Sequence, residues 1–445
     1  MLAGSILATT PAAAQVMNQD LKLTAADADF LDEYGHSVAV SGTTAVVGSH
    51  RDDDAGQTSG SVYVYDITTG LELFKLIASD TSQGDQFGHA VATSGSTAII
   101  GAFRNGDDGE GAAYLFDIVS GQQLHKLNAS DDVAFTDFGY SVAISGNIAI
   151  VGAPRDDDGG ANAGAAYLFD TSTGQQISKL SASDAEGDDW FGWSVAISGT
   201  TAIIGALRED SEGSNSGAAY VFDTTTSQQL FKLTASDAAA FDTFGVAVAI
   251  SGNTAIVGAS GDSYGLLTQA GSAYIFDATT GQELFKLTAS DAAGEEGLGN
   301  SIDISGDIAI LGASHDGDGG WISGSVYVFD VTSGQEVGKL TAADTSEGDL
   351  FGNAVAISGS TAVVGAFGDA HKGADGQYTG SAYVFNLNPC LPDWNTDDSL
   401  NFFDISEYIA DYNAQSPAAD LAAPFGSFNF FDIAEYISLF NAGCP

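Results

Sequence analysis

DLKLTAAD, residues 20–27, opens the regular part of the sequence and decides its fold. The phrase returns as FKLIASD, HKLNASD, SKLSASD, FKLTASD twice and GKLTAAD, and each return ends one unit of a long repeat. The regular part therefore begins with the closing phrase of its own repeat. This offset is typical of a closed ring, in which the two ends of the repeat region complete one unit together.

The repeat is marked by a step of one bulky residue followed by glycine, at intervals of 51 to 54 residues. After each step the chain continues as in FGWSVAISGTTAIIGA (191–206), GAAYVFD (217–223) and SQQLFKLTASD (227–237). Runs rich in β-branched and aromatic residues, separated by Gly- and Asp-rich turns, predict four strands per unit, A to D. The seven steps are Tyr34-Gly35, Phe87-Gly88, Phe138-Gly139, Phe191-Gly192, Phe244-Gly245, Leu298-Gly299 and Phe351-Gly352.

The spacing within the unit shows which connections are free to vary. The glycine of the step precedes a strand-B glycine by the same interval in every unit, as from Gly139 to Gly152. The ASD or AAD aspartate likewise precedes the next step by an unchanging interval, as from Asp131 to Phe138. From the strand-B glycine to the strand-C tyrosine, however, the interval changes, and it is shortest in the second unit and longest in the seventh. The B–C connection is therefore expected to project into solvent.

Seven four-stranded units predict an all-β fold, a seven-bladed β-propeller over residues 20–386. The seventh unit stops at Asn386 without a D strand. We expect residues 20–23 to supply that strand, so that both ends of the repeat region share one blade and no sheet edge stays open.

The pattern resembles the FG-GAP repeats of integrin α-subunit propellers and of many bacterial surface proteins. Phe138-Gly139 and Gly152-Ala153-Pro154 match the name literally, and the resemblance covers residues 20–386. In that family the A–B turn often carries a calcium loop with alternating Asp or Asn. The turns here, such as SGTT (198–201), are too short and too poor in carboxylates for an ion, so these calcium sites are not carried over.

The charge is strongly negative, with 59 acidic and 12 basic residues and a net charge of −47. Such a chain is repelled by nucleic acid and by anionic membranes, and no apolar run is long enough to span a bilayer. Nearly all of the few cations occupy repeat positions: seven of the eight lysines belong to the KL phrase, and the four arginines lie three residues after a strand-B glycine, at 51, 104, 155 and 208. We expect them to form ion pairs between blades.

One face of the predicted propeller carries most of the acid. Strands alternate in direction, so the B–C and D–A connections emerge on the same face. The candidate binding residues there are Asp52, Asp53, Asp54, Asp156, Asp157, Asp158, Trp190 and Trp321. The run RDDDGG (155–160) has two interpretations, a calcium loop or aspartates that cap their own backbone. The tryptophans likewise either stack on a sugar or pack against a neighbouring blade.

Catalytic constellations are harder to find in this sequence. The histidines at 36, 50, 89, 125, 315 and 371 fall in different repeat positions, with no paired spacing for a metal or a catalytic triad. Carboxylates are so abundant that a hydrolytic pair stays open as an alternative. No unit is visibly disturbed, however, so we expect a protein that is not an enzyme.

The two ends of the chain differ from the repeats. LAGSILATTPAAAQ (2–15) resembles the later part of a secretory signal peptide, expected over residues 1–14, whose true start is either Met1 or a residue upstream of it. Cys390 and Cys444 bracket the last segment, and in an exported protein they predict one disulfide.

Two copies of a loop and a helix-period segment, NFFDISEYIADYNAQ (401–415) and NFFDIAEYISLFNAG (429–443), predict a small α-helical module over residues 390–445. It resembles a type I dockerin, an EF-hand-like module, in the cysteine-terminated form found in planctomycete exported proteins. Alternating oxygen ligands predict one Ca²⁺ in the first loop, whereas DLAAPFGSFNFFD (420–432) lacks ligands. The alternative is a metal-free hairpin closed by the disulfide. The ligands of the first loop are Asp393, Asn395, Asp397, Ser399, Asn401 and Asp404.

Three functions stay open at this point. The first is an exported, monomeric scaffold for binding or adhesion, whose propeller binds a protein or glycan while the tail docks on a cohesin-like or surface receptor. The second is a tethered carbohydrate-active enzyme, a hydrolase or lyase, and the third is a purely structural surface protein. The regularity of the repeat favours the first.

Overall fold

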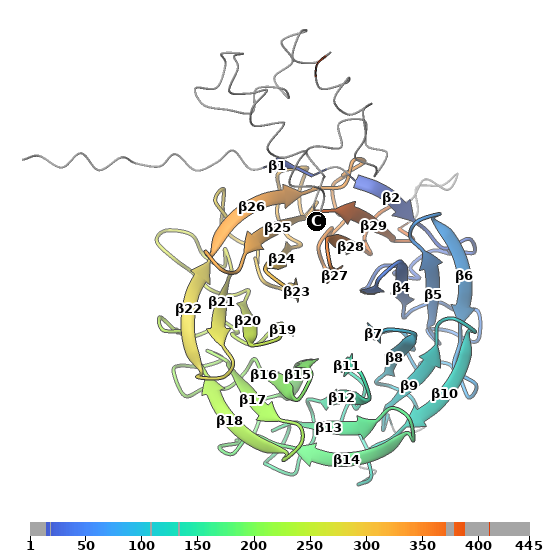
Figure 1. Ribbon diagram of the computed structural model, residues 1–445, viewed down its shortest axis with the longest axis horizontal. Helices are drawn as coiled ribbons and strands as arrows, with labels where there is room; N and C mark the ends of the chain where they lie inside the picture. The colour runs from blue at the N-terminus through green and yellow to red at the C-terminus, as the bar shows by residue number, and fades with distance from the viewer. Residues whose placement is uncertain are drawn as a thin grey trace, which may run out of the picture. The chain divides into compact units, whose positions relative to one another are not determined.

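Seven β-sheets, each built on four antiparallel strands, follow one another around a central axis (Figure 1). The computed structural model describes residues 15–17, 19–106, 109–131, 134–370, 378–387 and 409. The chain divides into two compact units, Met1–Phe385 and Asn386–Pro445. The first holds the repeats and contains the predicted all-β propeller with seven blades.

Each blade uses the four predicted runs in chain order, with strand A innermost and strand D at the rim (Figure 1). The A strands are β3 (Ser37–Ser41), β7 (Ala90–Ser94), β11 (Ser141–Ser145), β15 (Phe191–Ser198), β19 (Val248–Ser251), β23 (Ser301–Ser305) and β27 (Ala354–Ser358). The B strands are β4 (Thr44–Ser49), β8 (Thr97–Ala102), β12 (Ile148–Ala153), β16 (Thr201–Ala206), β20 (Thr254–Ala259), β24 (Ile308–Ala313) and β28 (Thr361–Ala366). The C strands are β5 (Ser61–Asp66), β9 (Ala112–Asp117), β13 (Ala165–Asp170), β17 (Ala218–Asp223), β21 (Ser272–Asp277), β25 (Ser325–Asp330) and β29 (Ser381–Asn386). The D strands of blades 1 to 6 are β6 (Leu71–Leu76), β10 (Gln122–Leu127), β14 (Gln175–Leu180), β18 (Gln228–Leu233), β22 (Gln282–Leu287) and β26 (Gln335–Leu340).

The seventh blade is completed by the start of the chain, as predicted. Strand β2 (Gln19–Leu23) pairs antiparallel with β29, with Leu21 opposite Val384 and Lys22 opposite Tyr383. A further short strand, β1 (Gln15–Val16), runs parallel to the edge strand β26 of blade 6. The sequence did not predict β1, because so short a strand shows no alternating period.

The hydrophobic core lies between neighbouring blades. Val64 and Leu76 of blade 1, for example, belong to one buried cluster with Phe87 and Tyr114 of blade 2. The ring of Phe87 meets that of Tyr114 edge to face, with centroids 5.6 Å apart. The aromatic residue of each step thus joins the start of strand A to strand C of its own blade and fills the space toward the preceding blade.

Glycine is required where the backbones of two blades meet. A Cβ atom at the strand-B Gly101 would lie 2.0 Å from the carbonyl oxygen of Gly139, the step glycine of the next blade. The same contact recurs at Gly205, whose added Cβ would lie 2.1 Å from the oxygen of Gly245. Within a blade, the amide of Gly139 donates a 3.0 Å hydrogen bond to the carbonyl of Gly152, which explains why the interval between these two repeat positions never changes.

Removal of the closing strand should destabilise the whole ring. A chain that starts at Thr24 loses the pairing of β2 with β29 and the ion pairs from Lys22 to Asp344 and Asp369. We expect it to unfold at a clearly lower temperature in circular dichroism than a control chain that starts at Gln15. Equal melting temperatures for the two chains would contradict closure by this strand.

Candidate binding face

The repeat lysines hold neighbouring blades together. The Nζ atom of Lys179 on β14 lies 2.7 Å from a carboxylate oxygen of Asp131, in the D–A connection that enters blade 3 from blade 2. The same ammonium lies 2.8 Å from Asp156, in the B–C loop of its own blade, and also contacts Asp158. We call this arrangement a lysine cluster. The others are Lys22 with Asp344 and Asp369, Lys75 with Asp27, Asp52 and Asp54, Lys126 with Asp80 and Asn105, Lys232 with Asp184 and Glu209, Lys286 with Asp237 and Asp262, and Lys339 with Asp291, Asp316 and Asp318.

The strand-C tyrosine completes the cluster. The hydroxyl of Tyr167 donates a hydrogen bond of 2.7 Å to the carboxylate of Asp156 and also contacts the carboxylate of Asp131. Burial alone would raise the pKa of Asp131, but hydrogen bonds from Lys179 and Tyr167 hold it below its ordinary value. The B–C and D–A connections therefore meet on one face, as predicted, and the expected ion pairs between blades are confirmed for the lysines.

The six candidate aspartates of this face are used by the fold. Asp52 and Asp156 are only 2% and 1% exposed and accept hydrogen bonds from a tyrosine. Asp53 accepts a hydrogen bond of 2.6 Å from the backbone amide of Thr58, and Asp157 accepts one of 2.8 Å from the backbone amide of Asn162. Asp54 and Asp158 contact the lysine of their own blade.

These contacts bear on the two interpretations of the run RDDDGG. The carboxylates of Asp131, Asp156 and Asp158 are close enough together to hold a metal ion. All three contact the ammonium of Lys179, which supplies the compensating positive charge. The amide of Asp158 also donates to Asp156, which is the backbone capping of the second interpretation.

A second set of acids, absent from the candidate residues above, lies two residues before the step in six of the seven units. Asp349 is buried and accepts the backbone amide of Ser346 at 2.6 Å. Burial, and to a lesser extent nearby carboxylates, raises the pKa values of Asp32, Asp189 and Asp349 to about 6. Burial also raises the pKa of Asp303, which lines the central channel, to about 6. The set comprises Asp32, Asp85, Asp189, Asp242, Glu296 and Asp349, with Thr136 in the remaining unit.

The two candidate tryptophans behave differently. Trp190 stacks on Trp193 with ring centroids 5.2 Å apart, and the guanidinium of Arg208 lies 3.5 Å from the centre of its ring. Trp190 therefore takes the packing alternative. Trp321 is 69% exposed and lines a groove.

The position after each step glycine makes the face asymmetric. It holds His36, His89, Tyr140 and Trp193 in the first four units, and Val246, Asn300 and Asn353 in the last three. The aromatic members form a continuous arc, in which His36 and His89, His89 and Tyr140, and Tyr140 and Trp193 lie 5.1, 4.8 and 4.5 Å apart between ring centroids. Each unit looks regular by itself, because it differs from the others at this one position only in the identity of a single residue.

The expectation that the histidines are scattered is wrong for three of them. The rings of His36 and His50 lie 4.0 Å apart between centroids, and His89 is 5.6 Å from His50. His36 comes directly after the step glycine Gly35, and His50 lies two residues after the strand-B glycine Gly48. The hydrogen bond from Gly35 to Gly48 brings these two positions side by side at the same end of blade 1.

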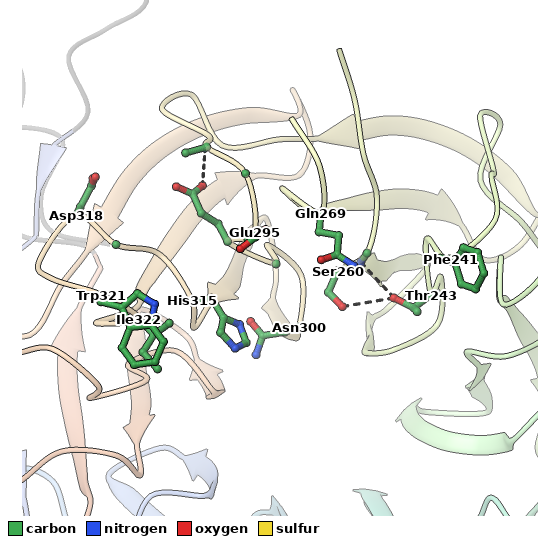
Figure 2. Close-up of a pocket in the computed structure, with 16 residues that line it drawn as sticks. Phe241, Thr243, Ser260, Gln269, Glu295, Asn300, His315, Asp318, Trp321 and Ile322 are labelled. Carbon is green, nitrogen blue, oxygen red and sulfur yellow. Dashed lines mark hydrogen bonds between the residues drawn. The ribbon is translucent and has the colours of Figure 1, made fainter. Parts of the chain in front are cut away.

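A groove of about 890 Å³ lies between blades 5 and 6 on this face (Figure 2). Its wall comes from the B–C loops of both blades, from the D–A connection between them and, at Phe241 and Thr243, from the D–A connection that enters blade 5. Figure 2 shows Phe241 at one end of the groove and Trp321 at the other. Between them lie polar side chains, namely Thr243, Ser260, Gln269, Glu295, Asn300 and His315.

Phe241 lies in a strained position. Its φ is +72°, a conformation that bulky residues rarely adopt, and its side chain is 58% exposed. The equivalent position, three residues before the step, holds glycine in units 2 and 7, at Gly84 and Gly348. The fold therefore requires only a positive φ here. An exposed phenylalanine therefore stabilises the fold little in this place.

Several sequence predictions concern residues outside the described ranges. These are the signal peptide at 1–14, the tail ligands Asp393, Asn395, Asp397, Ser399, Asn401 and Asp404, and the Cys390–Cys444 disulfide. They stay predictions. Within the described part of the chain, no helix has the length and apolar character needed to cross a membrane.

Blades of four strands are joined by close-packed glycines, by a lysine cluster and by the buried residue of each step, which is aromatic in every blade but the sixth, where it is Leu298. These features define a repeat-built β-propeller. The FG-GAP repeat matches this chain over residues 17–65, 72–116, 122–169, 175–222, 228–276, 282–329 and 335–385. The chain belongs to the FG-GAP repeat family. No curated protein matches it.

The two sets of acids predict how stability depends on pH. Asp32, Asp189, Asp303 and Asp349 have pKa values raised to about 6, so the folded state gains protons, and stability, as the pH falls through this range. Asp131 and the equivalent aspartates of the lysine clusters have lowered pKa values, so their contribution is lost only in more acidic solution.

We therefore expect the melting temperature to rise between about pH 7.5 and pH 5 and to fall below about pH 4. Circular dichroism of the β signal across this range provides the measurement. A melting temperature that only declines from pH 7.5 downward would show that the buried carboxylates do not have raised pKa values.

Proposed function

We propose that this protein is an exported, non-enzymatic binding protein, whose propeller binds a glycan in the groove between blades 5 and 6. The observation that carries the proposal is the pair of exposed aromatic side chains, Phe241 and Trp321, at opposite ends of a polar groove (Figure 2). Aromatic faces stack on the C–H faces of sugar rings, while hydroxyl, amide and imidazole groups bond sugar hydroxyls.

The charge of the chain narrows the glycan class. At a net charge of −47, sulfated or uronic-acid polymers are repelled. Glu295 lies in the groove wall and brings a further negative charge. A neutral or amino-sugar chain is therefore the better ligand.

The carboxylates around the groove favour binding over hydrolysis. A glycosidase needs two carboxyl groups that are available to the scissile bond. Glu296 accepts the backbone amide of Ala293 at 2.8 Å, and Asp318 lies 2.7 Å from the Lys339 ammonium. Of the described carboxylates in the wall, these two are engaged by the fold. A tethered hydrolase or lyase is the alternative that release of sugar would reveal.

For the tail, we propose a dockerin-like module with one Ca²⁺ that anchors the protein to a cohesin-like or other surface receptor. Support comes from the spacing of the six oxygen side chains and carbonyls from Asp393 to Asp404 and from the two cysteines, Cys390 and Cys444, that bracket this segment. The small-residue pattern before Gln15 supports export.

Two substitutions test the groove. Trp321→Ala removes one stacking surface, and Phe241→Gly places in blade 5 the residue that units 2 and 7 use at this position. In titrations with neutral and amino-sugar oligosaccharides, we expect each to weaken binding about tenfold, as for the loss of one aromatic contact. The melting temperature should stay close to that of the parent protein.

Phe135→Gly is the matched control, because Phe135 occupies the same strained position in another unit and does not line this groove. Unchanged binding by both groove variants, or no binding of any such oligosaccharide, would overturn the proposal. Release of reducing sugar from a bound polymer would show instead that the protein is a carbohydrate-active enzyme.

A further inference from the structure

Glu33, His36 and His50 form a cluster at the end of blade 1 that the proposed glycan groove does not use. One oxygen of Glu33 and one nitrogen of each imidazole all lie within 4.8 Å of one another. The Nε2 atom of His50 is 3.5 Å from Oε2 of Glu33. The Nδ1 atoms of both histidines are buried and have no hydrogen-bond partner among the described residues.

Unpartnered imidazole nitrogens in the interior call for a ligand. A buried polar atom without a partner costs free energy, and such atoms are rare unless water or an ion binds them. Here the two rings lie 4.0 Å apart and each has a nitrogen near the Glu33 carboxylate, which at His50 is Nε2 rather than the unpartnered Nδ1. Packing between the blades does not require imidazole at these positions, since other units hold Tyr140 or Leu207 there.

We propose that Glu33, His36 and His50 bind a divalent transition-metal ion, with Zn²⁺ as the best fit. Two imidazoles and a carboxylate are ligands that Zn²⁺ takes, whereas Ca²⁺ prefers oxygen alone. A tetrahedral ion with bonds of about 2.1 Å separates its ligand atoms by about 3.4 Å, so the three side chains need to close by little more than an ångström. Three protein ligands leave a fourth position for water or for an oxygen of a bound molecule.

The surroundings prepare the ligands. The Nη1 atom of Arg51 lies 2.7 Å from Oε1 of Glu33, which orients the carboxylate while Oε2 faces His50. The neighbouring His89 contacts the carbonyl of Tyr140 through Nδ1 at 3.1 Å and packs against the cluster from blade 2.

The test is calorimetric titration of the full chain with Zn²⁺ in the presence of excess Ca²⁺, which occupies sites made of oxygen alone. We expect one Zn²⁺ with micromolar or tighter affinity. His36→Ala with His50→Ala should abolish this binding, and Glu33→Gln, which keeps the shape of the side chain, should weaken it at least tenfold. Cobalt in place of zinc should give the intense visible absorption of a tetrahedral site, and this signal should disappear in the double variant.

A double variant of two other histidines, His125→Ala with His315→Ala, is the matched control and should bind Zn²⁺ like the parent protein. Should the first double variant fail to fold by circular dichroism, the Glu33→Gln titration decides alone. Absence of Zn²⁺ binding in the parent protein, or equal affinity in the parent and in the folded cluster variants, would overturn the proposal.

Discussion

The close approach of two glycines between neighbouring blades is the constraint on which the rest of this structure depends. The strand-B glycine of one blade touches the backbone of the step glycine in the next, as Gly101 does with Gly139, and a methyl group would not fit between them. The contact sets how closely neighbouring blades pack. The buried aromatic residue of each step can fill its space only at this separation.

The lysine clusters solve a problem that the acidity of the chain creates. Connections rich in aspartate converge between blades, and buried carboxylates without a partner would cost several kcal/mol each. One ammonium and one tyrosine hydroxyl per blade serve both connections, as Lys179 and Tyr167 do for Asp131 and Asp156. In the lysine clusters other than that of Lys126, the ammonium group lies next to a carboxylate of the B–C loop. Much of the acid on this face therefore stabilises the fold.

Most of the fold could be predicted from the sequence, because a spacing between two residues that is the same in every unit indicates a contact that is the same in every blade. The unchanging interval from the step glycine to the strand-B glycine reflects one hydrogen bond between them, and the early DLKL phrase is the missing strand of blade 7. The candidate binding face was harder to predict. Each unit contributes one unusual residue, such as His36, Tyr140 or Trp193, and only the circular arrangement brings these residues together.

The acidic runs also show why site residues are hard to predict from the sequence. Asp52 and Asp156 stand out in the sequence but are buried by the fold, while Phe241 and Thr243 look like ordinary loop residues and line the groove. Composition shows how much charge a loop carries. It does not show which lysine of which blade will neutralise that charge, since the partners Asp131 and Lys179 are 48 residues apart.

The most direct test of the central claim compares two glycines in equilibrium chemical unfolding. Gly101→Ala places a methyl group 2.0 Å from a backbone oxygen of the next blade, whereas Gly317→Ala, in a loop of blade 6, has its nearest neighbour at 3.9 Å. We expect Gly101→Ala to lose at least about 2 kcal/mol of unfolding free energy, and Gly317→Ala to stay within about 0.5 kcal/mol of the parent protein. Equal stability of the two variants would contradict the claim that glycine contacts between blades set the ring.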